Sequence, residues 1–457
     1  MNSLVFEYEA MSQKGTVAFF EKTAFWQIIN HYEKVKNFDK CIEVLNIATQ
    51  QHNFCSEFFQ HKASLLLRSN RLDEALQALT TAEALSPNDS ELQHLRIEIL
   101  TAMHCFEEAL ALANQKIGSL GTADESDFQA HTANIYEHVG AFDEMFDDLA
   151  ETLLLNGENT EALEKIGVAT EFSGRYEDSI ILHKTLLDNH PYSYLAWYNL
   201  GTAYARIEQH NKAVEAYEFA MVITGKNEFA FRDCAESYIQ IKNYAKALRC
   251  YEELLEHHDV DSDLLMRIGF CYEQLQQYKL AKAFYAKALQ FDDGNAEAHY
   301  LLGQMLFHDN ALESAATSYR RAIEYDDRNE KYHVALANVC YQMGDLEAAE
   351  AAYWKATEVA PDEYSCWLAL ADFLYNNKRS NDAIEVLDEG YAYACAVELL
   401  YTKIMYQFAN GKRKEALLAL QEVLLDDFDT HTALFEMAPE LRQDADVLAT
   451  IAAYQEG

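Results

Sequence analysis

The sequence predicts an all-α protein built as a helical solenoid, and two observations carry this prediction. The 457-residue chain contains only 4 Pro and 16 Gly, too few for the tight turns of many strands or for flexible linkers. Alanine, tyrosine and small residues also recur every 34 residues, which indicates a stacked repeat. Length alone would suggest about three compact domains, but a continuous repeat predicts one quasi-linear stack instead.

The 34-residue period is clearest in the second half of the chain. Six alanines share one register, namely Ala213, Ala247, Ala281, Ala315, Ala349 and Ala383. Five tyrosines share another, namely Tyr217, Tyr251, Tyr285, Tyr319 and Tyr353. Pro191 and Pro361 are 170 residues apart, which is five periods, and Pro87 joins their register if two residues are inserted near 118–122. Alanine, tyrosine and proline therefore indicate the same 34-residue period.

This pattern resembles the tetratricopeptide repeat (TPR), whose signature is Trp-x2-Leu-Gly-x2-Tyr, then Ala-x3-Phe, then Pro. The best match consists of Trp197, Leu200, Gly201, Tyr204 and Ala213, with Tyr217 in place of Phe. The segment Leu434–Tyr454 also resembles the ends of long bacterial TPR proteins, which implies no function. Twelve repeats are predicted over 22–430, starting at residues 22, 56, 90, 126, 160, 194, 228, 262, 296, 330, 364 and 397. The resemblance implies a right-handed superhelix of helix-turn-helix units.

Each repeat is expected to form two antiparallel helices. Positions 4, 7, 8 and 11 share one face of the first helix, and positions 20, 24 and 27 share one face of the second. Small residues at positions 8 and 20 let the two helices cross closely. Glycine at position 15 supplies a positive φ where the first helix ends, at Gly140, Gly174, Gly344 and Gly411. Proline at position 32 ends the second helix. Serines at repeat starts are expected to cap the first helix, at Ser56, Ser90, Ser126 and Ser262.

Both ends of the chain are expected to cover the stack. Residues 1–21 are expected to form an N-terminal cap, in which Phe6, Tyr8, Phe19 and Phe20 cover the first repeat. Residues 431–457 predict C-terminal capping helices at 432–437 and 446–455, on either side of Pro439, with a wetter outer surface.

Charge and composition limit the partners and the compartment. With 36 Lys+Arg against 75 Asp+Glu, the net charge of −39 argues against binding nucleic acid or an anionic membrane, because both depend on Lys and Arg. The start of the chain lacks the pattern of a signal peptide, and no apolar stretch is long enough to span a membrane. The nine cysteines form no CxxC pair and are interpreted as reduced core residues. We therefore expect a cytoplasmic protein.

The resemblance implies that positions 2, 5, 6, 9, 12 and 13 of each first helix face a concave groove. These positions are rich in aromatic and amide side chains, which predicts a site for a peptide or protein segment. The candidates are Tyr198, Asn199, Phe229, Phe270, Tyr300, Gln304, Asn338, Tyr341, Tyr375 and Tyr401. The alternative is that the aromatic rings pack on neighbouring first helices and fill the groove themselves.

Three arginines at groove positions, Arg206, Arg232 and Arg267, are candidate anchors for an acidic partner. The alternative, which we favour, is that nearby carboxylates neutralise them, with Asp233, Glu236 and Glu273 as the expected partners.

No catalytic residue, cofactor site or metal site is predicted. His299 and His333 share position 4 of adjacent repeats, but a zinc ion needs further ligands, so both are interpreted as core residues. The sequence lacks GxxxxGK[ST], GxGxxG, HExxH and GxSxG motifs. The predicted function is a non-enzymatic scaffold for protein interactions. The alternatives are a regulatory repeat protein whose superhelix changes on ligand binding, and an enzyme with a cryptic site in the groove. The oligomeric state stays open.

Overall fold

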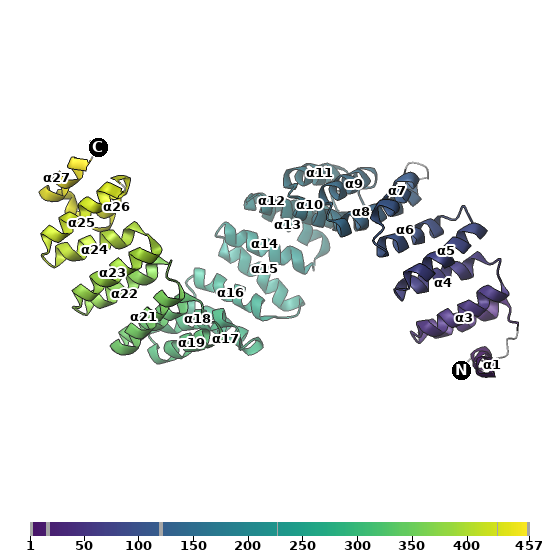
Figure 1. Ribbon diagram of the computed structural model, residues 1–457, viewed down its shortest axis with the longest axis horizontal. Helices are drawn as coiled ribbons and strands as arrows, with labels where there is room; N and C mark the ends of the chain where they lie inside the picture. Colours follow the sequence, from purple (N-terminus) through teal and green to yellow (C-terminus); the bar gives the residue numbers. More distant parts are fainter. Residues whose placement is uncertain (1–2, 15–18, 118–121, 226, 427, 455–457) are drawn as a thin grey trace. The chain divides into compact units, whose positions relative to one another are not determined.

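A computed structural model describes residues 3–14, 19–117, 122–225, 227–426 and 428–454, and its regular elements in these ranges are all helices. The chain divides into two compact units, Met1–Ser237 and Tyr238–Gly457. Within each unit the helices form successive antiparallel pairs (Figure 1). The predicted all-α solenoid of helix-turn-helix repeats is confirmed.

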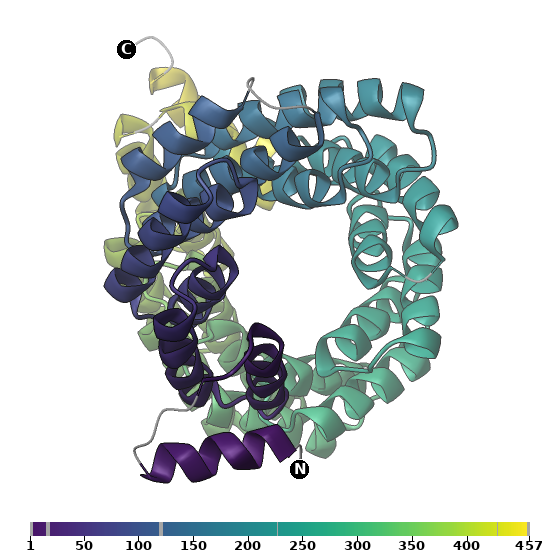
Figure 2. The same ribbon diagram turned by 90° about the vertical axis from the view of Figure 1, so that its right-hand side faces the viewer.

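The first unit contains α1 to α13 and most of α14. Helices α2 to α7 pack one on the next in sequence order. This part of the chain is drawn in purple to blue in Figures 1 and 2. The bounds are α1 Ser3–Lys14, α2 Lys22–Lys34, α3 Phe38–Gln51, α4 Ser56–Arg68, α5 Leu72–Leu85, α6 Ser90–Ala102, α7 Phe106–Lys116, α8 Thr122–Val139, α9 Phe142–Leu155, α10 Thr160–Ser173, α11 Tyr176–Asn189, α12 Tyr194–Arg206, α13 His210–Thr224 and α14 Glu228–Gln240.

The second unit continues the same alternation and ends in shorter helices. Its bounds are α15 Tyr244–His257, α16 Ser262–Gln274, α17 Tyr278–Phe291, α18 Ala296–His308, α19 Leu312–Tyr325, α20 Glu330–Gln342, α21 Leu346–Val359, α22 Tyr364–Asn376, α23 Ser380–Ala394, α24 Val397–Ala409, α25 Arg413–Asp426, α26 His431–Met437 and α27 Ala445–Tyr454, with 3₁₀ turns at Phe428–Thr430 and Pro439–Gln443.

The helix starts coincide with most of the positions where the sequence places a repeat start. Eleven helices begin at such a residue: α2, α4, α6, α10, α12, α14, α16, α18, α20, α22 and α24. The exception is α8, which begins at Thr122 rather than at Ser126. Of the 118–122 stretch near which the sequence places an insertion, 118–121 lie outside the described residues.

A left-handed residue follows the first helix of every pair from α2 to α24. The four predicted glycines have φ between 71° and 79°. Eight other residues adopt the same conformation without being glycine, at Lys36, Asn70, His104, Glu208, Lys242, Gln276, Asn310 and Lys378. All twelve lie at position 15 of the predicted repeat, so the turn geometry is kept even where the sequence lacks the residue that adopts it most easily.

In three pairs, α12–α13, α16–α17 and α18–α19, the core forms where a glycine of the first helix meets a tyrosine ring of the second. The six alanines of the Ala213 register are all fully buried, and the five tyrosines of the Tyr217 register are buried as well. A Cβ added at Gly201 would lie 2.7 Å from the Tyr217 ring, and one at Gly303 would lie 2.6 Å from the Tyr319 ring. Because no side chain fits there, these glycines allow the two helices to approach each other.

The predicted caps at Ser90 and Ser262 are wrong by one residue, and at Ser56 neither the serine nor the preceding Cys55 caps the helix. The side chains that accept a hydrogen bond from the first turn belong to the preceding residue, for example Asp89 before Ser90 and Asp261 before Ser262. Ser262 instead donates its hydroxyl to the Ala288 carbonyl at 3.2 Å, and thus joins the start of α16 to the end of α17. Ser56 makes the same bond to Ala82. The side chain of Ser126 lies outside the described residues.

The ends of the chain pack only in part as expected. Tyr8 and Phe20 are buried near α2, but Phe6 and Phe19 are 66% and 70% exposed, so these two do not cover the first repeat. At the other end, the hydrophobic cluster of α24 and α25 includes Leu434 of α26 and Val447 of α27. Gln455 and Glu456 lie outside the described residues.

Candidate functional site

The second unit has a hollow over its first helices, here called the α18–α22 hollow, of about 600 Å³. Helices α18, α20 and α22 line it, together with Glu273 at the end of α16 and Tyr319 of α19. Most of the lining residues occupy positions 2, 5, 6, 9, 12 or 13 of their repeats. Three of the predicted site residues are among them, namely Tyr300, Gln304 and Asn338.

Hydrogen bonds fix the polar side chains of this hollow. Gln304 Nε2 donates to the Tyr300 hydroxyl at 2.7 Å, and the Tyr353 hydroxyl donates to Asn338 Oδ1 at 2.6 Å. The Tyr300 ring packs near Tyr319 and Tyr332, with centroids 5.8 and 5.0 Å away, and burial raises the pKa of Tyr300. The walls are therefore preorganised before any partner arrives.

A smaller hollow of about 340 Å³ lies between α10 and α12 in the first unit, here called the α10–α12 hollow. Val168 and Phe172 line it from α10, and the predicted residues Tyr198, Asn199 and Arg206 line it from α12. The Tyr198 hydroxyl donates to Asp233 at 2.7 Å; burial, followed by this carboxylate, raises the pKa of Tyr198.

Asn199 lines this hollow, but its side chain is already hydrogen-bonded inside the fold. The side chain is buried, and its Nδ2 donates to the Leu163 carbonyl at 2.7 Å. The same nitrogen lies 3.3 Å from Nε2 of the buried His183, whose Nδ1 lies 2.7 Å from the Ser179 carbonyl. Burial lowers the pKa of His183 to about 4, so the imidazole is neutral and accepts from Asn199.

The three groove arginines each pair with a carboxylate. Arg206 contacts both carboxylate oxygens of Glu171, at 2.7 and 2.9 Å. Arg232 pairs with Glu228 at 3.0 Å, and Arg267 lies 3.6 Å from Asp263. This agrees with the favoured expectation of local neutralisation. Burial raises the pKa of the expected partner Asp233, and the charge of Arg206 acts in the opposite direction but by less. The arginines therefore do not stand out as anchors for an acidic partner.

Several of the predicted aromatic residues pack on the first helix of the following repeat, as expected if the rings fill the groove themselves. The Tyr375 ring stacks on Tyr406 with centroids 3.9 Å apart, and Tyr341 meets the edge of Phe373 at 5.4 Å. Tyr401 is fully buried and bonds to Thr430, so its assignment to an open groove is wrong.

The two predicted phenylalanines lie outside both hollows. Phe270 packs edge-on against Tyr244, with ring centroids 6.1 Å apart. Phe229 is 68% exposed at the start of α14.

His299 and His333 are buried and hydrogen-bonded, as interpreted from the sequence. Their Nε2 atoms lie 2.9 and 3.0 Å from the carbonyls of Asp293 and Asp327, each six residues earlier. Trp197 and Trp367 donate in the same way to the carbonyls of Pro191 and Pro361. A ring nitrogen at position 4 thus repeatedly ties a first helix to the preceding turn.

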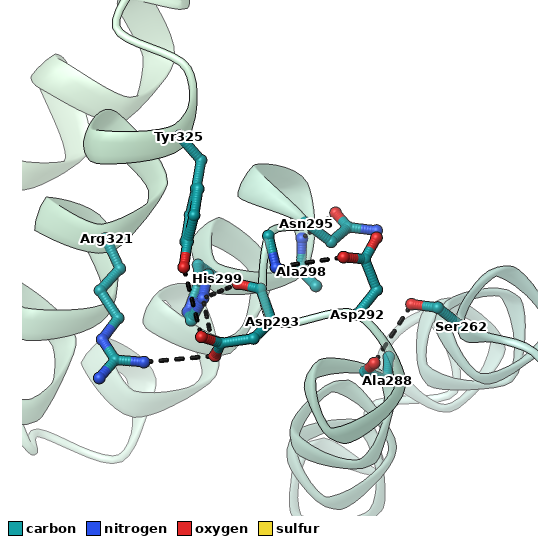
Figure 3. Close-up of polar contacts among 10 residues, drawn as sticks. Ser262, Ala288, Asp292, Asp293, Asn295, Ala298, His299, Arg321 and Tyr325 are labelled. Carbon is teal, nitrogen blue, oxygen red and sulfur yellow. Dashed lines mark hydrogen bonds and ion pairs between the residues drawn. The ribbon is translucent and has the colours of Figure 1, made fainter.

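The junction around Asp293 shows this arrangement in detail (Figure 3). Its carboxylate lies 3.3 Å from both Arg321 and the Tyr325 hydroxyl, and the His299 and Tyr325 rings stack. Within the described residues no group of three His, Cys, Asp or Glu side chains is placed to hold a metal ion.

A further hollow of about 490 Å³, which was not predicted from the sequence, lies over α2, α4 and α6. Trp26, His61 and His94 line it together with Glu57, Glu91 and Glu98. The sequence feature that could have predicted this hollow is an aromatic or imidazole ring at position 5 or 6 of successive repeats. It lies in a part of the chain where the repeat signature is weak.

Tetratricopeptide repeat family models match residues 194–221, 235–296, 292–330 and 330–373. The chain is also similar to solved structures. One is the C-terminal part of a TPR repeat-containing protein from Cytophaga hutchinsonii, with 13% identity over 55% of this chain and 98% of that chain, and a TM-score of 0.44.

Two further solved structures are similar at lower scores. For the APC/C hetero-tetramer Cut9–Hcn1 the identity is 12% over 87% of this chain and 91% of that chain, with a TM-score of 0.38. For YrrB, described as a TPR protein with an unusual peptide-binding site, the identity is 18% over 41% of this chain and 96% of that chain, with a TM-score of 0.36. No curated protein matches the sequence. Among the described helices none is both long and apolar enough to cross a membrane.

Proposed function

We propose that this chain, a tetratricopeptide repeat protein, is a non-enzymatic scaffold that holds an extended segment of another protein on the first helices of its repeats. The observation that supports it most is the α18–α22 hollow, because three successive first helices contribute to one continuous surface of about 600 Å³. Pockets of this size with apolar walls and a few fixed polar groups are typical ligand sites.

The lining of the hollow suits a peptide. Phe307, Met305 and Val334 offer an apolar surface for a side chain. Because Asn338 Oδ1 already accepts from Tyr353, its amide N–H groups are the donors that could meet a peptide carbonyl. Bonds to the partner's main chain would supply affinity, and the apolar walls would select among side chains.

The proposal includes the organisation and the location of the protein. The chain comprises twelve repeats over 22–430, with caps at 1–21 and 431–457. It acts in the cytoplasm. Its partners are proteins, since a net charge of −39 disfavours nucleic acids and anionic membranes. Seven of the nine cysteines are buried, which suits thiols that act as small core residues.

The test is to fill the hollow with one large side chain. Asn338 is an exposed residue in the middle of the surface, so Asn338→Trp places a large ring there. Glu347→Trp is the matched control, because Glu347 is an exposed residue of α21 that does not line the hollow. Proteins captured from native lysate by each variant are then quantified by mass spectrometry.

Partners that bind the wild type and Glu347→Trp but are lost with Asn338→Trp would support the proposal. Circular dichroism must show the same helicity for all three proteins. If every captured protein binds Asn338→Trp as well as it binds the wild type, the hollow is not the binding site and the proposal should be dropped.

A further inference from the structure

We propose that the segment held in the α18–α22 hollow is basic, with Lys or Arg residues beside an apolar side chain. This inference rests on the proposed function and adds the chemistry of the partner. An acidic partner would depend on the groove arginines, and Arg206, Arg232 and Arg267 each pair with a carboxylate, as the favoured expectation held.

The charges that line the hollow are mostly negative. Glu273, Glu330 and Glu363 contribute carboxylates from three different repeats, and Lys331 is the one Lys or Arg among the lining residues. A cationic side chain that enters the hollow therefore meets an excess of carboxylates, whereas an acidic side chain would be repelled.

Two of these carboxylates are held in place by neutral hydrogen-bond donors. Glu273 accepts a hydrogen bond from the Tyr285 hydroxyl at 2.6 Å, and Glu363 accepts one from the Ser365 N–H at 3.2 Å at the start of α22. Neither bond supplies a positive charge. In the described part of the chain none of the three glutamates forms an ion pair with Lys or Arg, unlike the carboxylates beside Arg206 and Arg267. Their charge remains available to a partner.

The apolar part of the hollow sets the second requirement. Phe307, Met305 and Val334 lie among the glutamates, so a purely ionic partner would leave apolar surface in water. Helices packed at about 9 Å put three first helices within about 20 Å, which about six extended residues span. A short stretch with an apolar residue between basic ones fits both the surface and its length.

A second copy of this protein does not fit as the occupant. Each chain carries a net charge of −39, so two copies repel each other at long range. The occupant is therefore a basic segment of a different protein.

The experiment uses the full chain and a phage-displayed library of random peptides of about twelve residues, long enough to cross three helices. Selection is run in parallel on the wild type and on Asn338→Trp, and only sequences enriched on the wild type alone are kept. Synthetic peptides from this set are then titrated by fluorescence anisotropy against the wild type, Glu330→Lys and the control Glu313→Lys. Glu313 is an exposed residue of α19 outside the hollow.

We expect the retained peptides to combine Lys or Arg with an aliphatic or aromatic residue. Glu330→Lys should weaken their binding roughly tenfold, whereas Glu313→Lys should change it less than about twofold, because the second charge lies outside the hollow. Raising the NaCl concentration from about 50 to about 300 mM should weaken wild-type binding, since exposed charges are screened.

Two contrary outcomes are distinguishable. Retained peptides that are neutral or acidic, or that bind Glu330→Lys as tightly as wild type, would overturn the basic partner while leaving the peptide-binding function in place. A selection in which no peptide depends on the open hollow would overturn both.

Discussion

Tyr285 lies across Gly269 so closely that a Cβ at this glycine would be 2.5 Å from the tyrosine ring. Gly269 is at position 8 of its repeat and Tyr285 at position 24, and the same relationship joins Gly201 to Tyr217 and Gly303 to Tyr319. Part of the 34-residue period in the sequence therefore reflects one packing contact that recurs in three repeats.

Replacing Gly269 with alanine should destabilise the second unit. The Tyr285 ring is fully buried and cannot move aside cheaply, so we expect a loss of about 1–3 kcal/mol, the usual cost of overpacking. Urea unfolding followed by circular dichroism measures it. Gly294→Ala is the control, because its nearest neighbour is 3.4 Å away, an ordinary contact distance. Equal unfolding midpoints for the two variants would contradict the role of this contact.

Gln276→Gly should make the protein more stable. Gln276 has a φ of 60°, a conformation that costs a residue with a Cβ about 1 kcal/mol. The same turn already uses glycine in other repeats, for example Gly344 with a φ of 79°. We expect a gain below about 1 kcal/mol, because glycine also loses more entropy on folding. Gly344→Ala should shift the unfolding midpoint in the opposite direction, and shifts of the same sign would refute the explanation.

Ala281→Asp should split the stack. Ala281 is fully buried at position 20, where its helix crosses the first helix of the same repeat. A carboxylate there would be desolvated between packed helices, at a cost of several kcal/mol. Differential scanning calorimetry should show a large fall in the melting temperature, whereas an unchanged value would show that the repeat register is wrong.

His183 should make the stability of the first unit depend on pH. Burial lowers its pKa to about 4, below the ordinary value near 6.5, so the unfolded chain binds a proton more readily than the folded one. Its contribution is fully present above pH of about 6.5 and is lost as the pH falls toward 4. His183→Gln keeps a neutral polar side chain and removes the titration. The variant should lose less stability than wild type between pH 6.5 and pH 4, and an identical pH dependence would contradict this account.

The positions of most helices could be predicted from the sequence because several residue types in each repeat indicate the same register. A mistaken register at one alanine conflicts with the tyrosines and prolines of the same repeat. The start of α8 could not be predicted, because Ser126 was placed by counting across the stretch where the period breaks. The caps were misplaced for a similar reason: Ser90 marks the repeat start, but Asp89 has the extended backbone that a cap requires.

The candidate site was harder to predict because position in a repeat does not reveal what a side chain touches. Tyr375 and Tyr300 both occupy predicted groove positions and both pack on a ring of the next first helix, and Tyr300 also lines the α18–α22 hollow. The bond between Asn199 and His183 could not be predicted, because His183 stands where five of the twelve predicted repeats have tyrosine. Such pairings depend on neighbouring repeats and become visible only when the helices are placed.

The most direct test of the proposed function is site-specific photo-crosslinking in the protein's own cells. A photoreactive amino acid is placed at Asn338 in the α18–α22 hollow, and in a separate variant at the control position Glu347 on α21. We predict that position 338 crosslinks to a discrete partner protein through a short basic segment, and that position 347 does not. A protein that crosslinks equally from both positions, or from neither, would contradict the scaffold function assigned to this hollow.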